Sequence, residues 1–558
     1  MLVSPKLGID GAEWLREALR EMEGGKETVC IKTDIEFPDS TVSVKRIRSA
    51  YEALAPKWSV PEECGSAEDW NKLFNNAPDS SAFRQFLELK RDGSDDGYLA
   101  FVANKTARFA DFNHAKIVAL LDVQPHDPRF ETFYSERKAL LKAFSDAAVA
   151  EYVTETKIKG ENRIHYLTDN TMLERKGVIE SLGGRDTIPL DEVARRYPAL
   201  AEYLRDFAFD DERLTDYFRQ YKRQKVVNRI EPDFFDTVCE NAQTRAYNLL
   251  PTRDGVIDQL DKAKAKLYFV DALGVEFLGF IQARCAILGL RMDVNIVRAN
   301  LPSITTPYNR KFYDDWLGEK SWTRELDDIK HKEEGGFDYQ KTKFPVHLAK
   351  ELEILGEVLE RIKAELALGG SRKAVLASDH GASRLVVVNG QELKYEVDMR
   401  GEYSGRCCAE CPADGLGTVT VENGWLVLAD YGRFKGGRAA AVEVHGGATN
   451  EEVIVPVIEM TLMDKKIEIK PVDSVITGNY RTTATLVLFS TTELNGVSAV
   501  VRGKRYVAER VDANRWRVAM PDIKRTDAYT AEVFEGMNLI GNVGFTVKSG
   551  AAKENDLL

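Results

Sequence analysis

The chain has 558 residues, of which 44% are hydrophobic and 30% are charged, and its formal net charge at pH 7 is −12. A chain of this length is expected to form about three or four domains, and its hydrophobic content excludes disorder over most of its length. The acidic balance excludes a uniformly basic surface for nucleic acid, although a local basic groove stays compatible with it.

Cysteine usage and hydropathy indicate the compartment. The seven cysteines are mostly isolated, which favours reduced thiols over a disulfide framework. The first ten residues lack the continuous apolar core of a secretory signal. The most apolar long window, residues 267–290, contains Asp271, Glu276, Gln282 and Arg284, which would be costly in lipid. We therefore expect a soluble, cytoplasmic protein with no membrane partner.

The N-terminal half of the chain divides into two predicted regions. Residues 1–189 are expected to form an α+β module, with helical character at residues 13–22 and strand-like alternation at Thr28–Thr33. Residues 190–264 are predicted to be a helical region, because acidic residues suit its first turn and apolar residues follow at helical spacing. These residues are Asp191, Glu192, Val193, Tyr197, Leu200 and Leu204.

A basic stretch lies within the helical region. Residues 213–229 hold six basic residues interleaved with Tyr217, Phe218 and Tyr221. Such a stretch could contact a phosphate backbone and stack on bases, and so hold a polyanionic substrate. The alternative is a solvated helix whose aromatic side chains face a core.

Residues 265–464 alternate strands with helices. Leu267–Gly274 and Val294–Arg298 are predicted to be strands, with a helical stripe from Phe277 to Leu288 between them. A long helix is predicted to begin near Pro345 and to end at Gly369-Gly370. This alternation predicts an α/β fold with a mostly parallel sheet covered by helices on both faces.

The segment of residues 465–550 has a different pattern. Short apolar runs separated by turn residues predict a small antiparallel, immunoglobulin-like β-sandwich. The predicted strands are residues 484–489, 498–502, 515–519 and 529–534.

The polar groups that could carry chemistry follow predicted strands. The apolar run from Lys373 ends in Asp379-His380-Gly381. Ligand groups gather outside the carboxyl ends of strands in open α/β sheets, and Asp379 and His380 offer an oxygen and a nitrogen suited to zinc or a similar divalent metal. The alternative for such a triplet is an ordinary turn.

Three more segments could complete such a site. Asp271 ends a buried apolar run, where a carboxylate costs free energy unless a cation compensates it; the alternative is a helix cap. Residues 301–309 place hydroxyls in a loop after a strand, where a metal could make one a nucleophile; the alternative is a Ser/Thr turn. His445 precedes two glycines, and a lone histidine there is more often structural.

Taken together, the motifs carry a resemblance to a known family. They are Val270-Asp-Ala-Leu-Gly274, Pro302-Ser-Ile-Thr305, Ser378-Asp-His-Gly381, and His445-Gly-Gly followed by Glu451-Glu-Val-Ile-Val-Pro-Val457. In this order they resemble the PglZ domain, a family of the alkaline phosphatase superfamily. The resemblance implies an alkaline-phosphatase-like core. Because PglZ proteins are best known from bacterial phage-defence systems of the BREX type, it also implies a role beside other phage-defence proteins.

The resemblance further implies two divalent metals, with Zn²⁺ suited to the ligands and Mn²⁺ a reasonable alternative. Asp271, Thr305, Asp379 and His380 would surround one metal, with Thr305 the nucleophile and Thr306 the fallback. His445 would bind the second metal.

The remaining ligands of the second metal have two candidate sources. The superfamily takes them from an Asp-x-x-x-His element, whose spacing Asp327 and His331 match. No glycine precedes this histidine, and no clear apolar strand leads into the element. Asp338 with His347 is the alternative pair.

The implied reaction is hydrolysis of a phosphoester through a covalent intermediate on Thr305. A phosphodiesterase or nuclease is the favoured interpretation. The alternatives are a phosphomonoesterase and a catalytically degenerate scaffold of a defence complex. Cys407, Cys408 and Cys411 form a separate cluster, but a structural zinc site would need a fourth ligand and no second cysteine pair follows, so reduced thiols are expected.

Overall fold

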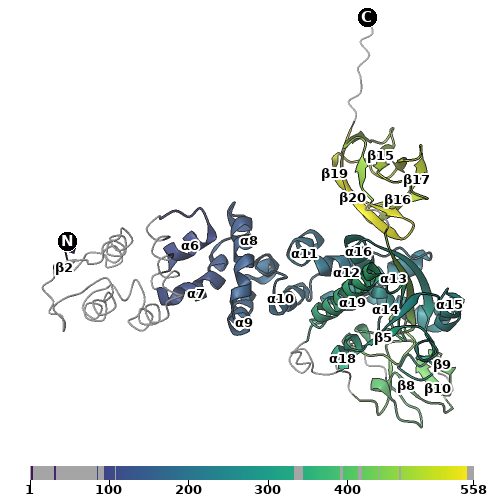
Figure 1. The fold of residues 1–558 in the computed structure, drawn as a ribbon. Coiled ribbons are helices and arrows are strands. Elements are labelled where there is room, and N and C mark those ends of the chain that lie inside the picture. The colour runs from purple at the N-terminus through teal and green to yellow at the C-terminus, as the bar shows by residue number, and fades with distance from the viewer. Residues whose placement is uncertain are drawn as a thin grey trace, which may run out of the picture. The chain divides into compact units, whose positions relative to one another are not determined.

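The structure is a computed structural model that describes residues 93–549, except 107–108, 332–342, 390–393, 413–416, 439, 441 and 464–466, together with residues 2–3, 31–32, 85 and 89. The chain forms two compact units, Met1–Ser181 and Leu182–Leu558 (Figure 1). Each unit is described by itself.

The first unit is helical in most of its described part. Arg137 on α8 and Glu174 on α10 form a fully buried ion pair of 2.9 Å, and the Arg137 guanidinium lies 3.6 Å from the ring centroid of Tyr152 on α9. A short parallel pair joins β1 (Leu2–Val3) and β2 (Ile31–Lys32), the latter inside the predicted strand. The helix predicted at residues 13–22 lies outside the described residues. The helices are α6 (Tyr98–Lys105), α7 (Phe109–Val118), η3 (Ala119–Asp122), α8 (Phe130–Leu140), η4 (Leu141–Ala143), α9 (Asp146–Glu155), η5 (Thr156–Tyr166) and α10 (Met172–Leu182), the last of which ends at the boundary with the second unit.

The second unit begins with the predicted helical region and continues into an α/β core. The helix expected near Pro345 is confirmed as α19, and it ends at Gly369, whose φ of +75° is the left-handed conformation that glycine adopts readily. The helices of this unit are α11 (Leu190–Arg196), α12 (Pro198–Leu204), α13 (Glu212–Val227), α14 (Pro232–Thr244), η6 (Ala246–Leu249), α15 (Arg253–Gln259), η7 (Val275–Phe277), α16 (Leu278–Leu288), α17 (Lys311–Asp314), α18 (Glu325–His331), α19 (Leu348–Leu368), α20 (Leu385–Val388), η8 (Tyr403–Gly405) and α21 (Asn450–Val453).

The central sheet has the strand order β4-β12-β6-β3-β5. β3 pairs in parallel with β5 and β6, whereas β12 runs antiparallel to its neighbours β4 and β6. The mixed α/β fold is thus confirmed, and four of the five strands run the same way, but the antiparallel strand was not predicted. The first residue of β12, Ile454, pairs with Arg298, the last residue of β4, so the two strands run in opposite directions. The strands are β3 (Ala265–Val270), β4 (Leu290–Arg298), β5 (Lys320–Thr323), β6 (Lys373–Ala377) and β12 (Ile454–Leu462).

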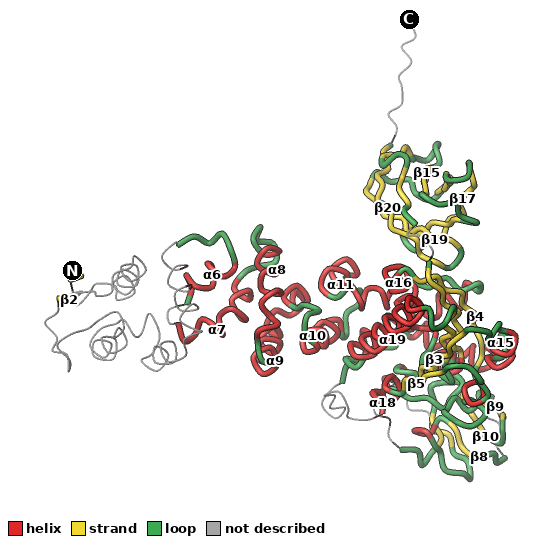
Figure 2. Tube along the Cα trace, viewed as in Figure 1, coloured by secondary structure: helices red, strands yellow, loops and turns green. Residues whose placement is uncertain are grey.

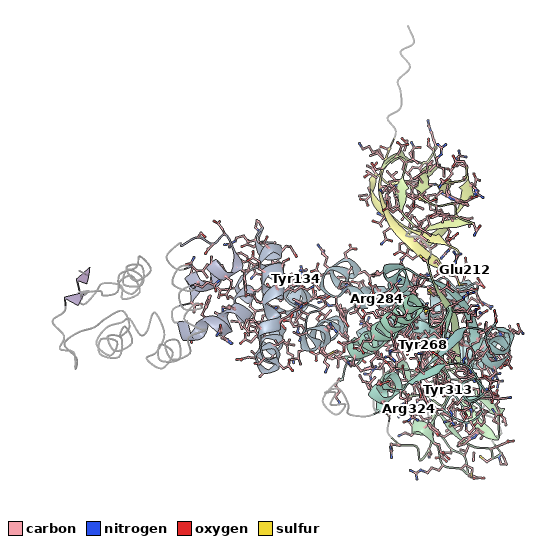
Figure 3. All side chains as sticks on the ribbon, viewed as in Figure 1. Tyr134, Glu212, Tyr268, Arg284, Tyr313 and Arg324 are labelled. Atoms are coloured by element: carbon pink, nitrogen blue, oxygen red, sulfur yellow. The ribbon has the colours of Figure 1, made fainter. Side chains whose placement is uncertain are left out.

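Helices cover both faces of this sheet (Figures 1 and 2). On one face α16 and α19 pack against β4, β12 and β6. The apolar stripe of α19 is buried, and each leucine removed from water contributes about 1.5–3 kcal/mol. On the other face, α15 and α17 contribute Ile257 and Phe312 to a core shared with the strands. Tyr313, labelled in Figure 3, belongs to that layer, with its ring 5.5 Å from the ring of Phe269 on β3.

Helix α13 contains most of the basic stretch, and its aromatic side chains face inward. Tyr217, Phe218 and Tyr221 are buried, so they are not available to stack on bases. Lys222 and Lys225 are buried as well. Of the two interpretations of this stretch, the one in which the aromatic side chains face a core is confirmed, because a hydrophobic stripe at helical spacing gains more by joining the core than by facing water.

The C-terminal segment forms one eight-stranded sheet in the order β13-β15-β18-β17-β16-β19-β20-β14. Its neighbouring strands are antiparallel except for the pair β14 and β20. Alternate residues of β18 point into its core, Trp516, Val518 and Met520 among them, as the period-two pattern predicted. The antiparallel β-domain is confirmed, and its immunoglobulin-like class stays a prediction. The strands are β13 (Ile469–Pro471), β14 (Val475–Thr477), β15 (Ala484–Ser490), β16 (Val497–Val501), β17 (Lys504–Arg510), β18 (Arg515–Met520), β19 (Asp527–Glu535) and β20 (Asn538–Lys548).

Two small sheets lie in the segment between β6 and β12. One has the order β8-β10-β9 and the other joins β7 to β11. Across the described residues of both units, no helix is long and apolar enough to cross a membrane. The small strands are β7 (Lys394–Tyr395), β8 (Cys407–Ala409), β9 (Val419–Glu422), β10 (Trp425–Leu428) and β11 (Arg433–Phe434).

Candidate metal centre

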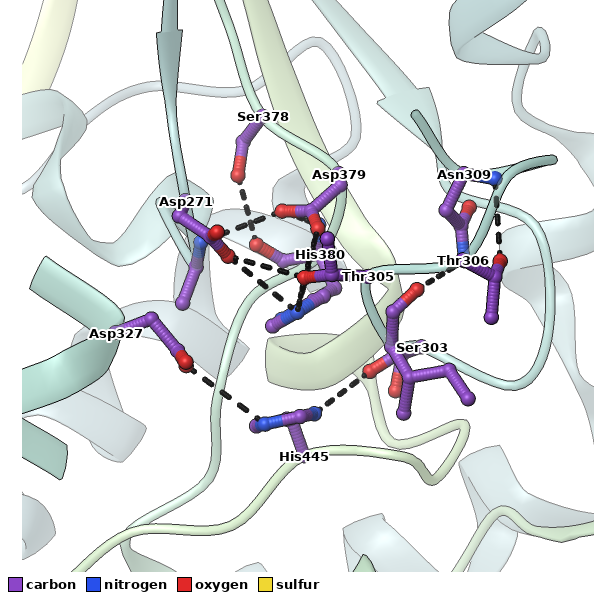
Figure 4. Close-up of polar contacts among 12 residues, drawn as sticks. Asp271, Ser303, Thr305, Thr306, Asn309, Asp327, Ser378, Asp379, His380 and His445 are labelled. Carbon is purple, nitrogen blue, oxygen red and sulfur yellow. Dashed lines mark hydrogen bonds and ion pairs between the residues drawn. The ribbon is translucent and has the colours of Figure 1, made fainter. Parts of the chain in front are cut away.

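The first group of site residues gathers at the carboxyl ends of β3 and β6 (Figure 4). Asp271 follows β3, and Asp379 and His380 follow β6, the parallel neighbour of β3. The two turns are joined where the Leu273 amide donates a hydrogen bond to Ser378 Oγ at 2.8 Å. All three site residues are buried, and their donor atoms lie within 4.8 Å of one another.

Thr305 brings a hydroxyl to this group. Its Oγ1 lies 2.6 Å from Asp379 Oδ2, 3.3 Å from Asp271 Oδ1 and 3.4 Å from His380 Nε2. The side chain of Thr305 reaches the acids while the residue stays exposed. Thr306, the fallback nucleophile, instead accepts a hydrogen bond from the Asn309 amide, so its hydroxyl serves the following turn.

Asn309 holds the loop that carries Thr305. Its Oδ1 accepts from the amide of Asn300 at 3.0 Å, and its Nδ2 lies 2.9 Å from Pro302 O and 3.0 Å from Ile304 O. One buried side chain therefore fixes both ends of a short irregular segment whose backbone groups have no strand partner.

The second group consists of Asp327, His331 and His445. Asp327 and His331 lie one turn apart on α18, with Nε2 of the histidine 3.2 Å from Asp327 Oδ1. His445 Nε2 lies 3.7 Å from the same oxygen. The element does follow a strand, β5, which its sequence did not reveal because Lys320-Ser-Trp-Thr323 is short and half polar.

Of the alternative pair, only His347 belongs to the described residues. Asp338 is outside the described residues. His347 is fully buried and its Nε2 lies 2.9 Å from Glu443 Oε1. The Lys225 ammonium lies 2.6 Å from that same carboxylate oxygen, so a protein cation already balances the acid. The described structure thus brings Asp327 and His331, rather than His347, to His445.

The two groups adjoin through their histidines. The rings of His380 and His445 are stacked with centroids 4.2 Å apart. Nδ1 of His380 lies 3.0 Å from the carbonyl of Gly381, and Nδ1 of His445 lies 3.0 Å from the carbonyl of Ser303. A carbonyl only accepts, so each Nδ1 carries a proton, and in a neutral ring Nε2 is then the nitrogen that holds the lone pair. A backbone partner of this kind orients histidines that bind metals.

The electrostatics of the groups favour a cation. Burial, followed by the negative charges of Asp379 and Asp327, raises the pKa of Asp271 to about 9. Burial and the neighbouring His380 hold the pKa of His445 well below its usual value, so its imidazole is neutral. Like charges gathered in a buried site without a protein cation are costly.

The donor set fits divalent metals. The Thr305 hydroxyl has one proton to give, and Asp379 is the nearer acceptor, which leaves Asp271 Oδ1 without it. Asp327 Oδ1 is buried and has no well-aligned hydrogen bond within the described residues. Carboxylate oxygens and imidazole nitrogens are the ligands that Zn²⁺ and Mn²⁺ take.

Several supporting residues escaped the sequence analysis. Trp322 donates its indole N–H to Asp271 Oδ2 at 3.1 Å, and Arg253 donates to the carbonyl of Asp379 at 2.9 Å. Ser303 Oγ donates to Gly447 O at 2.6 Å and accepts from the Gly446 amide at 2.9 Å, which ties the Thr305 loop to the His445 loop. Ser303 alone had a signal, since it lies inside Pro302-Ser-Ile-Thr305.

The cysteine cluster lies apart from these groups. Cys407 and Cys408 are buried on β8, and both they and Cys411 are free thiols, as expected. Burial raises the pKa of the Cys408 thiol to about 12, which keeps it protonated. Among the described residues, the groups suited to a metal contain no cysteine.

Two models of protein families match the chain, one near each end of its described part. A family model described as "Domain of unknown function (DUF7863)" matches residues 85–184, and one described as "Domain of unknown function (DUF7862)" matches residues 467–550. No curated protein matches the chain. The first matched segment contains α6 to α10 and the second contains the β-domain, so the residues of both candidate metal groups lie between the matches.

Proposed function

We propose that the protein is a metal-dependent phosphoesterase of the PglZ type, with an alkaline-phosphatase-like core and an immunoglobulin-like C-terminal domain. The observation that carries the proposal is the position of Thr305. Thr305 is an exposed residue whose hydroxyl contacts Asp271, Asp379 and His380, and the stacked ring of His445 brings the second group beside it. A hydroxyl between two sets of metal-suited donors is the arrangement that in-line displacement at phosphorus requires.

Each group would hold one divalent ion. Asp271, Asp379 and His380 would hold the first with Thr305, and Asp327, His331 and His445 would hold the second. Bound ions of this kind lower the pKa of a coordinated hydroxyl and neutralise the charge of a phosphoryl group. Zn²⁺ suits the mixed oxygen and nitrogen donors, and Mn²⁺ is the alternative.

Each residue of the site has its own role in the proposed reaction. Thr305 Oγ1 gives its proton to Asp379 Oδ2, the nearer acceptor, and attacks phosphorus. The bond between phosphorus and the leaving-group oxygen breaks, that oxygen takes up a proton from water, and a phospho- or nucleotidyl-threonine forms. Water then attacks the same phosphorus and releases the threonine oxygen, which recovers a proton. Asn309 and Ser303 keep Thr305 in place, and neutral His445 offers a lone pair where a charged histidine would repel a cation.

Two aspects of the proposal rest on the family resemblance. A phosphodiester substrate, nucleic acid included, is preferred, although the donor set serves monoesters and diesters alike. A role in BREX-type phage defence follows from the motif order. The presence of Thr305 and all six other donor residues favours an enzyme over a degenerate scaffold.

The experiment compares two chromogenic esters. Purified protein is assayed for bound Zn and Mn by mass spectrometry, and its turnover of bis-p-nitrophenyl phosphate and p-nitrophenyl phosphate is measured with Thr305→Ala as the matched variant. Diester turnover that Thr305→Ala abolishes supports the proposal. Turnover of the monoester alone supports a phosphatase, and a metal-free protein that remains inactive after Zn²⁺ or Mn²⁺ is added contradicts both.

A further inference from the structure

A basic groove runs along the β-domain, away from the candidate metal centre. It consists of two adjoining cavities of about 830 and 350 Å³, which share Arg502 and Lys504 in their walls. The larger lies between the helices α11 to α13 and the strands β16, β17 and β19, and the smaller lies on the β-domain alone.

The charge of the groove is opposite to that of the chain. Its walls contain eight basic and four acidic side chains, whereas the whole chain has 77 basic and 89 acidic residues. Half of these basic side chains are balanced locally. Arg205 pairs with Glu532 at 2.8 Å and Arg219 with Asp206 at 2.7 Å, while Arg502 pairs with Asp527 at 2.7 Å and Lys504 with Asp522 at 2.5 Å. A concentration of positive charge in a hollow attracts polyanions.

Several of the basic groups have no carboxylate partner within the described residues. Arg223, Lys524 and Arg525 are exposed and form no ion pair there. Arg505 is exposed, donates to Ser498 Oγ at 2.7 Å and lies over the ring of Phe534, while the nearby Glu532 is paired with Arg205. Arg223, Lys524 and Arg525 are therefore available to meet an external anion.

The groove also presents an aromatic ring to solvent. Tyr480 is 87% exposed, and the Lys524 ammonium lies 5.1 Å from its ring centroid. A ring beside cations is the combination by which proteins hold unpaired nucleic-acid strands, with bases stacking on aromatics and phosphates meeting Lys and Arg. A duplex keeps its bases stacked on each other and would leave the ring unused.

We propose that this groove binds single-stranded nucleic acid, with the basic side chains on backbone phosphates and Tyr480 stacked on a base. The site is separate from the proposed catalytic centre and does not depend on it. It includes Arg219 and Arg223 of α13, the helix on which the sequence suggested a nucleic-acid surface, although the aromatic side chains of that helix are buried.

The test is fluorescence anisotropy with a labelled single strand of about 12 nucleotides, within the range that one small β-domain covers. Full-length protein carrying Thr305→Ala is used, so that cleavage cannot distort binding. Tyr480→Ala is expected to weaken binding about 10-fold, and Tyr480→Phe to retain it. Lys524→Glu with Arg525→Glu is expected to weaken binding at least about 10-fold and to lower its dependence on salt between about 50 and 200 mM.

The matched control is Lys470→Glu, an exposed lysine on β13 outside both cavities, which should leave the affinity unchanged. Absence of binding overturns the proposal, as does binding that Tyr480→Ala and the double charge reversal leave unchanged. A duplex or a polyglutamate peptide that binds as tightly as the single strand, with the same dependence on these residues, overturns the choice of ligand. None of these outcomes depends on phosphoester turnover.

Discussion

At the scale of single residues, Asn309 shows how a side chain without chemistry of its own can govern a reactive one. It bonds both ends of the loop from Asn300 to Ile304, and Thr305 follows directly. We expect Asn309→Ala to lower kcat for a phosphoester about 100-fold, because displacement of a nucleophile by about 1 Å has an effect of that size. Steady-state kinetics, together with bound metal measured on the same samples, provides the check.

Thr306→Ala is the control for that prediction, since the residue lies in the same loop and its hydroxyl accepts only a turn hydrogen bond. It should keep kcat within about 3-fold of the wild type, as a lost surface contact of about 0.5 kcal/mol allows. If Thr306→Ala were inactive and Thr305→Ala active, the nucleophile would be Thr306 and the role given to Asn309 would be wrong.

Asp327 allows a direct test of the second metal group. Asp327→Asn keeps the shape of the side chain and removes its charge, so we expect the protein to lose one of two equivalents of bound metal. Activity should fall about 100-fold or more, beyond what loss of a supporting residue causes. Asp328→Asn, on the next position of α18, should change neither quantity. Equal metal content in wild type and Asp327→Asn would remove Asp327 from the site.

The residues of the candidate site differ in how far the sequence reveals them. Asp271, Asp379 and His380 could be predicted because each directly ends an apolar run, and a strand end is a local feature. Trp322 and Arg253 could not, because each reaches a strand end that lies far from it in the chain. Contacts of that kind are set by sheet order, which no local pattern contains.

At the scale of elements, a buried charge network connects α13 with the segments around the second group. Lys225 on α13 lies 2.6 Å from Glu443 and 3.1 Å from Glu276, and all three side chains are buried. Lys330 on α18 pairs with Glu351 on α19 in the same cluster. Glu443 lies two residues before His445, and Lys330 lies one residue before His331. The network therefore supports the loop of His445 and the helix α18 that carries His331.

Lys225→Met should therefore destabilise the fold strongly. The substitution leaves Glu443 and Glu276 in a dry site with less positive charge, and the expected loss is about 3–5 kcal/mol of unfolding free energy. Urea denaturation followed by circular dichroism measures it. Arg223→Met on the exposed side of the same helix should stay within about 0.5 kcal/mol of wild type. A small effect of Lys225→Met would show that water reaches the network.

Elements were predicted best where their pattern is long. Helix α19 has an apolar stripe over several turns and a glycine end, and it lies close to where that pattern placed it. β5 was missed because four residues show no clear alternation, and the direction of β12 was missed because antiparallel and parallel strands share one pattern. On α13 the helical spacing of the aromatic residues indicated a buried face, whereas the number of basic residues suggested a surface for a polyanion.

At the scale of the whole molecule, the second unit joins an α/β core to a β-domain through specific polar contacts. Asn538, which opens β20, is buried and its Oδ1 accepts a 2.7 Å hydrogen bond from the amide of Met292 on β4. Nearby, the Gln282 side chain of α16 donates to the carbonyl of Met537 at 2.5 Å. β4, an edge strand of the central sheet, is thus hydrogen-bonded to the start of β20.

We expect Asn538→Ala to weaken this connection by about 1–3 kcal/mol, because it leaves the Met292 amide buried without an acceptor. Differential scanning calorimetry should show the transition of the β-domain separating from that of the core. Asn542→Ala is the control, since Asn542 lies on the same strand and is exposed, and it should leave the calorimetric profile unchanged. If both variants unfold like the wild type, water replaces the lost acceptor and the β-domain is held by its apolar contacts. In that case the apolar contacts also preserve the basic groove between the helices and the β-strands, and Asn538→Ala should leave single-strand affinity intact. If the β-domain instead separates from the core, single-strand affinity should fall.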